Sequence, residues 1–176
     1  SREAVDTYAL NSHEQALQTQ TSGWFADEIV AVRNESFELD GYQPRGITLP
    51  RRVDAATLDS HVRRTDFLAL ATLRAIHAGG VQTAGNSCAV VDGAAAVLVG
   101  RASAGTRPAL ANLLATAVVG VAPEFMGIGP APAIQLLLQR SGLVLDDIAL
   151  FEINEAQGAQ VLAVAQALEL DTNKLN

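Results

Sequence analysis

The chain is poor in the residues that usually build disulfides and metal centres. Its 176 residues include one cysteine, three histidines, one methionine and one tryptophan. A single cysteine excludes an internal disulfide, and histidines without a second thiol or a close histidine pair give no recognisable metal-binding spacing. A reducing compartment fits this composition. There is also no uninterrupted run of about 18 apolar residues, so we expect no membrane span.

Basic residues are outnumbered, with 12 Lys and Arg against 19 Asp and Glu and a net charge of −7 at pH 7. This balance argues against nucleic acid as a partner, because such binders gather Lys and Arg on one face. The local exception is the segment RRVDAATLDSHVRR, residues 51–64. We favour a solvated loop for it and keep a phosphate pocket as the alternative.

Small apolar residues are what the chain has in excess. Hydrophobic residues make up 49% of it and aromatic residues only 5%, so Ala, Val and Leu dominate. This composition is typical of closely packed helix and sheet layers in one globular domain. The chain begins with Ser1, inside a predicted helix, with no initiator methionine and no signal peptide. We therefore expect a piece of a longer protein.

The first half of the chain predicts two helices with a strand between them. Residues 1–23 form a helix that starts at Ser1 and stops at a glycine. Residues 24–32 predict a strand, and the Gly- and Pro-rich segment 34–54 predicts loops or a hairpin. A second helix is expected over 65–80, capped by Thr65 and ended by two glycines.

The second half alternates apolar segments with helices. Periodicity does not decide between helix and strand for 81–100, and β-branched residues near the end of 109–121 favour a strand there. Within residues 123–142, a Gly/Pro loop leads into a helix that stops at a glycine. A strand over 148–153 and a helix over 155–168 follow. The alternation predicts an α/β layered fold with its site at the carboxyl ends of strands.

The segment FEINEAQG, residues 151–158, places Asn154 and Glu155 at the junction of a predicted strand and helix. A side-chain amide donates and accepts at once, so Asn154 fits the holding of a water or the steadying of an oxyanion. A cap for the following helix explains Asn154 equally well. Glu155 is expected to cap the backbone or to form a local pair.

Two other motifs carry weaker signals. Cys88, in GNSCAVVDGAAA, would be an activated nucleophile near a helix start, but a lone cysteine is usually a small buried hydrophobe. The segment MGIGP, residues 126–130, lacks the Lys-Ser/Thr of a phosphate loop and the third glycine of a dinucleotide fingerprint. We interpret it as a turn.

Four blocks in order resemble segments of the thiolases, acyl-CoA acyltransferases that cleave or form 3-ketoacyl-CoA. They are SREAVDTYALNSHEQA, GNSCAVVDGAAAVLV, GVAPEFMGIGPAPAI and LDDIALFEINEA. The resemblance covers nearly the whole chain and implies the layered α/β/α thiolase fold, here incomplete. Residues 1–120 would be the end of the N-terminal domain with its loop region, and residues 121–176 the start of the C-terminal domain.

The resemblance also implies an activity for the longer protein. This would be thiolytic cleavage of 3-ketoacyl-CoA, or the reverse Claisen condensation, through an acyl-cysteine intermediate, most plausibly in fatty acid β-oxidation. The nucleophilic Cys and the His of a GHP motif would lie outside this chain, which alone is expected to be inactive. Coenzyme A is implied as a substrate with no bound cofactor, in a homodimer or tetramer of the cytoplasm or an organelle matrix.

Residue roles follow from the resemblance position by position. Asn154 matches the Asn of the NEA motif, a catalytic residue that holds a water of the oxyanion hole. The positions implied along the acyl and CoA channel are Cys88, Ala89, Met126, Ala156, Gln157 and, at the nucleotide end, Arg63 or Arg64. Cys88 stands where the family has Ser, Ala89 where it has Gly, and Gln157 where it has Phe. These departures imply a different substrate preference.

Two further function classes are compared with this enzyme. A non-catalytic thiolase-like protein that binds acyl-CoA or a partner subunit would explain the altered GNSCA and NEAQG segments as lost chemistry. The related ketoacyl synthases share the fold but are not expected to carry the NEA segment, so FEINEA argues against them. The flanking sequence decides between the first two.

Overall fold

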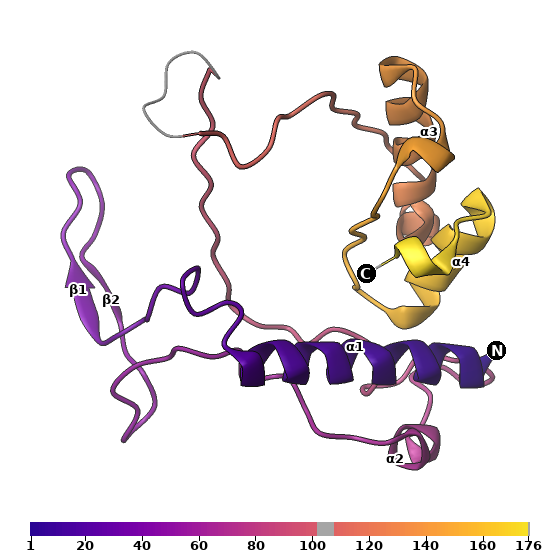
Figure 1. The fold of residues 1–176 in the computed structure, drawn as a ribbon. Helices are drawn as coiled ribbons and strands as arrows, with labels where there is room; N and C mark the ends of the chain where they lie inside the picture. Colours follow the sequence, from indigo (N-terminus) through magenta and orange to yellow (C-terminus); the bar gives the residue numbers. More distant parts are fainter. Residues whose placement is uncertain (102–107, 176) are drawn as a thin grey trace.

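We describe the protein from a computed structural model, in which residues 1–101 and 108–175 are described (Figure 1). Its longest element is helix α1 (Arg2–Ser22). The Ser1 hydroxyl accepts a hydrogen bond of 3.2 Å from the backbone N–H of Ala4, and Gly23 ends the helix in the left-handed conformation. The predicted helix is therefore confirmed at both ends.

A hairpin follows α1, formed by the antiparallel strands β1 (Glu35–Phe37) and β2 (Arg45–Ile47). It is the only sheet among the described residues, and it confirms the hairpin expected within 34–54. The strand predicted over 24–32 is wrong. Residues 23–28 turn instead, and Val32 forms one isolated bridge with Ala56. No strand of the described chain lies alongside this segment to pair with it.

The second predicted helix is much shorter than expected. Helix α2 (Phe67–Thr72) is capped by Asp66, whose carboxylate accepts from the N–H of Ala69 at 2.8 Å, and not by Thr65. It ends where the Arg2 guanidinium donates to the carbonyls of Leu70 and Leu73 at 2.7 and 3.0 Å. Those carbonyls would accept backbone N–H groups in a longer helix, so Arg2 takes the place of the next turn.

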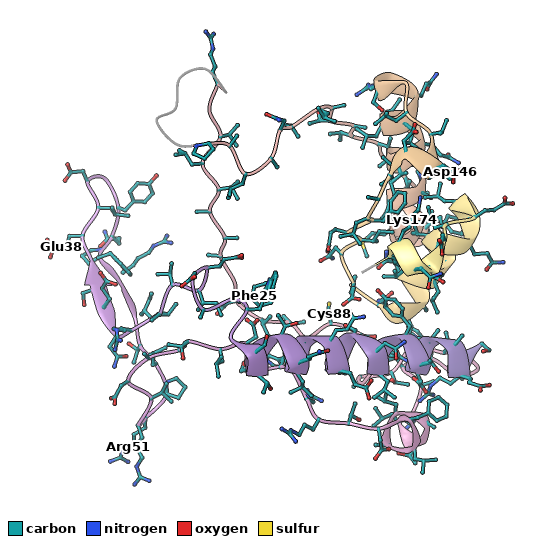
Figure 2. All side chains as sticks on the ribbon, viewed as in Figure 1. Phe25, Glu38, Arg51, Cys88, Asp146 and Lys174 are labelled. Atoms are coloured by element: carbon teal, nitrogen blue, oxygen red, sulfur yellow. The ribbon has the colours of Figure 1, made fainter. Side chains whose placement is uncertain are left out.

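The C-terminal part, residues 123–175, is mostly helical, and a hydrogen bond links two of its short helical segments. Its elements in order are η1 (Pro123–Ile128), α3 (Pro130–Ser141), η2 (Leu145–Asp147), α4 (Gly158–Leu168) and η3 (Thr172–Lys174). Helix α3 starts on prolines and stops at Gly142, as predicted. Helix α4 begins three residues later than predicted, with Gln157 at its N-cap. The Lys174 ammonium donates to the carbonyl of Asp146 at 3.2 Å, linking η3 to η2 (Figure 2).

The core surrounds α4, which packs against α1, α3 and η1. The buried apolar side chains of this cluster are Ala131, Phe151, Ile153, Val161, Val164, Ala165, Leu168 and Leu170. The strand predicted over 148–153 is reduced to one parallel bridge between Phe151 and Leu175. Phe151 and Ile153 are nevertheless buried in the cluster around α4, whereas Leu150 is 55% exposed.

Residues 89–101 and 108–121 are extended and mostly exposed, and the second segment reaches the C-terminal elements only near its end, where the Arg140 guanidinium of α3 donates to the carbonyl of Thr116 at 3.2 Å. Figure 1 shows the trace leaving α1 and returning only at α3. Figure 2 shows side chains standing off both sides of the trace, and Val90, Leu98 and Leu110 are fully exposed. The strand expected near 121 is thus not formed, since neither segment pairs with a strand in the described chain. None of the described helices combines the length and apolarity needed to cross a membrane.

Candidate functional site

The junction 154–158 lies against residues 86–88, which come from far earlier in the chain. The N–H of Cys88 donates to the carbonyl of Ala156 at 3.0 Å, and the N–H of Gly158 donates to the carbonyl of Asn86 at 3.0 Å. Ser87 and Gln157 form an antiparallel bridge between them. The structure therefore brings together three residues that the sequence predicted along one channel, Cys88, Ala156 and Gln157.

Asn154 lies at the exposed edge of this junction, directly after the buried Ile153. Its backbone carbonyl accepts from the N–H of Ala156 at 2.9 Å. Helix α4 starts at Gly158 with Gln157 as N-cap, so the interpretation of Asn154 as a helix cap is wrong. In the part of the chain that the structure describes, no hydrogen bond uses its side-chain amide, which leaves both polar atoms available to a ligand or a water.

Glu155 is held by helix α1. Its carboxylate oxygens each accept one hydroxyl, Oε1 from Tyr8 at 2.5 Å and Oε2 from Ser12 at 2.7 Å. The expectation of a backbone cap or a local pair is therefore wrong, because both donors come from the other end of the chain. Burial first, and then the hydrogen bond to Glu155 and the charges of Glu155 and Glu152, raise the pKa of Tyr8.

A groove of about 620 Å³ runs along this contact between α1 and the C-terminal elements. Tyr8, Ser12 and Glu155 form part of its wall. Its other lining residues come from the first turns of α1, from α4 and from residues 172–175. The Tyr8–Glu155–Ser12 contact thus lies at a surface that solvent reaches.

Gln157 has a specific partner. Its side-chain carbonyl accepts from the amide of Gln82 at 2.5 Å. A half-buried amide needs such a partner, because an unpaired buried polar group costs about 1–3 kcal/mol. This bond to Gln82 fixes the side chain of Gln157, the residue that stands where phenylalanine was expected.

The remaining predicted channel residues differ in how they are placed. Cys88 and Ala89 are exposed, so the expectation that Cys88 is a small buried hydrophobe is wrong. Met126 is 69% exposed in η1, and the same turn approaches α4 closely. A Cβ at Gly127 would lie 3.1 Å from Cγ of Gln160. The MGIGP segment, which was predicted as a turn, therefore packs against α4.

Arg63 is exposed and is fixed through its backbone. Its N–H donates to Nδ1 of His13, on α1, at 3.4 Å. No hydrogen bond within residues 1–101 and 108–175 joins its side chain to the junction. The structure places Arg63 beside α1.

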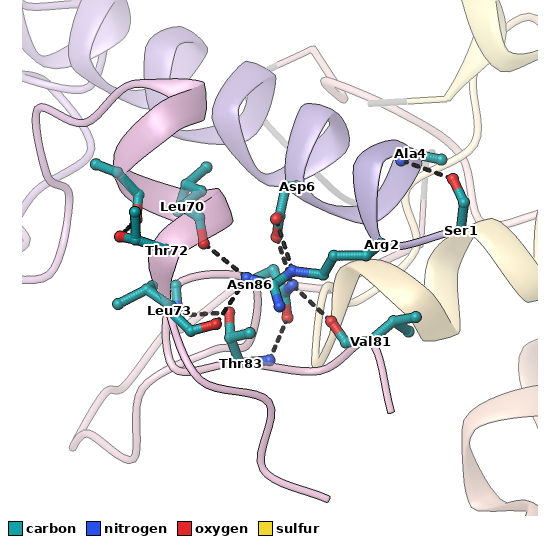
Figure 3. Close-up of polar contacts among 12 residues, drawn as sticks. Ser1, Arg2, Ala4, Asp6, Leu70, Thr72, Leu73, Val81, Thr83 and Asn86 are labelled. Carbon is teal, nitrogen blue, oxygen red and sulfur yellow. Dashed lines mark hydrogen bonds and ion pairs between the residues drawn. The ribbon is translucent and has the colours of Figure 1, made fainter. Parts of the chain in front are cut away.

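A buried polar network holds Asn86, whose carbonyl contacts the junction (Figure 3). The fully buried carboxylate of Asp6 accepts from Nε of Arg2 at 2.6 Å and from Nδ2 of Asn86 at 2.7 Å. Asn86 also donates to the carbonyl of Val81 at 3.0 Å and accepts from the N–H of Thr83 at 2.8 Å. Charge-assisted hydrogen bonds of this kind fix geometry strongly inside a protein. The side chain of Asn86 is therefore fixed by α1 and by residues 81–83, while its backbone carbonyl accepts from Gly158.

Sequence reasoning missed the supporting residues Asp6, Tyr8, Ser12 and Asn86. Tyr8 and Ser12 are four residues apart on a predicted helix, so they share a face, and a hydroxyl pair at that spacing was the available signal. Nothing in the local sequence names Glu155 as their partner. Among the described residues, no group of three or more His, Cys, Asp or Glu side chains is arranged to hold a metal ion.

Two protein-family models match the chain. The model described as "Thiolase, N-terminal domain" matches residues 1–103, and the one described as "Thiolase, C-terminal domain" matches residues 107–176. Together they cover almost all of the sequence, in the order that the four sequence blocks indicated.

Curated relatives match over the whole chain. The human protein named "3-ketoacyl-CoA thiolase, peroxisomal" is 42% identical over 181 residues, which is 100% of this chain and 41% of that protein. The "3-ketoacyl-CoA thiolase" of Yersinia pestis (strain Pestoides F) is 42% identical over 177 residues, 97% of this chain and 42% of that protein. The chain spans about two fifths of the length of the curated relatives it matches.

Solved structures agree with the sequence matches. The acetyl-CoA acetyltransferase of Bacillus anthracis is 35% identical with a TM-score of 0.79, covering 100% of this chain and 43% of that one. The dimeric peroxisomal thiolase of Saccharomyces cerevisiae is 34% identical with a TM-score of 0.81, covering 99% of this chain and 42% of that one. At this identity the match shows the layered thiolase fold, of which this chain is a part.

Proposed function

The chain belongs to the thiolase family, and we propose that it is part of an enzyme that cleaves 3-ketoacyl-CoA with coenzyme A, or runs the reverse condensation. The names of its relatives support this reaction, and the length of those relatives supports a nucleophilic Cys and a catalytic His outside these 176 residues. The acyl group would pass through a thioester on that Cys. This chain would supply part of the substrate channel and one oxyanion donor.

The observation that carries the proposal is the position of Asn154. It is exposed at the edge of a junction whose neighbouring residues, Glu155, Ala156 and Gly158, are all fixed by hydrogen bonds to other segments. A fixed backbone with an available amide is what an oxyanion site requires, because the donor must already point at the developing charge. In our proposal the amide orients a water toward the thioester oxygen. A donor of this kind contributes roughly 3–4 kcal/mol.

The channel itself is proposed from the surrounding residues. Cys88, Ala89, Ala156 and Gln157 would face the pantetheine arm, which is supported by the bridge that joins the two segments. Met126 would line the acyl pocket, and Arg63 would meet the nucleotide end of CoA. CoA acts here as a substrate and not as a bound cofactor.

Assembly, compartment and domain division belong to the same proposal. A solved relative is a dimer, which supports a homodimer or a tetramer. Relatives with peroxisomal names and bacterial relatives support an organelle matrix or the cytoplasm. The two family models, which meet between residues 103 and 107, support an N-terminal and a C-terminal part, for which we propose residues 1–120 and 121–176.

The test is thiolysis by the full-length protein, followed through loss of the 3-ketoacyl-CoA enolate absorbance. We expect Asn154→Ala to lower kcat by roughly a hundredfold or more, the cost of one oxyanion donor. Asn34→Ala is the matched control, because Asn34 lies beside the exposed hairpin and, among the described residues, its side chain makes a single hydrogen bond, from the N–H of Leu49. An unchanged rate for Asn154→Ala would refute its assignment.

A non-catalytic acyl-CoA-binding protein is the second candidate, and the altered NEAQG and GNSCA segments favour it. The nucleotide sequence on both sides of this chain separates the two. A Cys-containing segment upstream and a GHP segment downstream are expected for the enzyme. Finding neither segment would refute the proposed enzyme and favour a protein that binds acyl-CoA without turnover.

A further inference from the structure

We propose that Tyr8 and Ser12 of helix α1 are positioning residues for Asn154, acting through the carboxylate of Glu155. The inference rests on the proposed function, since it concerns the same junction. It adds the opening helix of this chain to the residues that control the reaction, although no part of α1 would touch the substrate.

The first argument is the geometry of the contact. Each carboxylate oxygen of Glu155 receives one hydroxyl, from Tyr8 at 2.5 Å and from Ser12 at 2.7 Å. The donors lie four residues apart on one face of α1, so they present a pair of O–H groups in fixed relation. A carboxylate held at both oxygens cannot rotate without losing a bond.

The second argument is the protonation state of the donor. Burial, followed by the contact with Glu155 and the charge of Glu152, raises the pKa of Tyr8, so its hydroxyl keeps its proton throughout the physiological range. Hydrogen bonds from a neutral hydroxyl to an ionised carboxylate are about twice as strong as neutral ones. The contact is therefore stable at the pH at which the enzyme would work.

The third argument is the short path from Glu155 to Asn154. One peptide bond joins the two residues. The backbone N–H of the next residue, Ala156, donates a hydrogen bond of 2.9 Å to the carbonyl of Asn154. At the other side, Gly158 is held by Asn86, which Asp6 of the same helix α1 holds in turn at 2.7 Å. Both flanks of the junction are thus fixed to α1. Displacing a catalytic group by about 1 Å can cost roughly a hundredfold in rate.

The experiment removes the donors one at a time in the full-length protein and measures thiolysis. We expect Tyr8→Phe and Ser12→Ala each to lower kcat by about tenfold, with KM for both substrates changing less than about twofold. Tyr42→Phe and Ser22→Ala are matched controls. Tyr42 is 69% exposed near the hairpin, and the Ser22 hydroxyl donates to the carbonyl of Thr19 within its own helix. Both controls should keep the parent kcat.

A double-mutant cycle separates positioning from a loss of general stability. Glu155→Gln should lower kcat to a similar degree, and adding Tyr8→Phe to it should have little further effect, because the two changes break one contact. Additive losses, unchanged kcat in both hydroxyl variants, or a rise in KM alone would each overturn the inference. If Tyr8→Phe does not fold, Ser12→Ala and Glu155→Gln complete the test.

The proposed function is tested separately by Asn154→Ala. If that variant loses activity while Tyr8→Phe and Ser12→Ala keep it, the positioning role fails and the proposed function stands. If the parent protein does not turn over, the proposed function fails first.

Discussion

Two regions of this chain differ sharply in how they are held. We call α1, residues 81–88 and residues 151–175 the packed region, and residues 24–62 together with 89–101 and 108–121 the open region. The packed region holds most of the buried apolar side chains and the buried polar groups Asp6 and Asn86. In the open region, side chains such as Trp24 and Leu98 are 75% and 101% exposed.

The open region is not polar, and this is what the comparison teaches. Val97, Leu98 and Leu110 are as apolar as the buried Val161 and Val164, and yet they lie in solvent. Apolar composition alone does not bury a segment, because burial also needs a partner at the right distance. In the packed region α4 is that partner. For residues 89–101 and 108–121 we expect it to be supplied by other segments of the longer protein proposed above.

The largest expected difference between the regions is in amide hydrogen exchange of the 176-residue chain. The N–H groups of Val161 and Gly158 should exchange roughly a thousandfold more slowly than those of 89–100, which make no backbone hydrogen bonds in the described structure. Mass spectrometry of peptic fragments measures both. Equal protection would mean that the open region is packed in solution. In the full-length protein the two should become similar.

Two Asn→Ala substitutions, one in each region, compare the regions by the free energy of unfolding. Asn86→Ala removes a donor from the buried Asp6 carboxylate and the acceptor of the Thr83 N–H, and should lower the free energy of unfolding by about 3 kcal/mol. Asn34→Ala, beside the hairpin, breaks one exposed bond and should cost less than about 1 kcal/mol. Urea titration compares them. Similar costs would contradict a structural role for the buried network.

The smallest expected effect is on how the stability of the folded protein falls with pH above about pH 10. Because the pKa of Tyr8 is raised in the folded state, the folded protein holds the proton of this hydroxyl more tightly than the unfolded chain does. Its contribution is therefore complete below the unfolded pKa of about 10 and is lost as pH rises beyond it. Tyr8→Phe should flatten the fall in unfolding midpoint above pH 10, and Tyr42→Phe should not. An identical pH profile in all three proteins would exclude this linkage.

The sequence predicted helices best where their ends are marked by local chemistry. Ser1 and Gly23 bound α1, and Gly142 ends α3, as their residue types require. The prediction failed at α2 because Arg2, distant in sequence, takes the carbonyls that a longer helix would use. It failed for the strands because a strand is defined by its neighbour, and local pattern does not supply one.

The candidate site divides in the same way. The resemblance placed Cys88, Ala156 and Gln157 in one channel, and the structure joins their segments by a bridge. The roles of these residues and of Asn154 stay predictions. The partners of Glu155 could not be read from the sequence, because Tyr8 and Ser12 lie 147 and 143 residues away.

Helix α1 has a consequence for which changes of length this chain tolerates. Its residues meet separate segments in a set angular order, with Arg2 at α2, Asp6 at Asn86, and Tyr8 and Ser12 at Glu155. An α-helix turns by about 100° per residue, so one residue inserted between Asp6 and Tyr8 would put these contacts out of phase. Insertions are absorbed without such a rotation in extended chain, as at Gly93 or Gly100. Sequence drift in this protein should therefore change the length of its loops while leaving the length of its first helix constant.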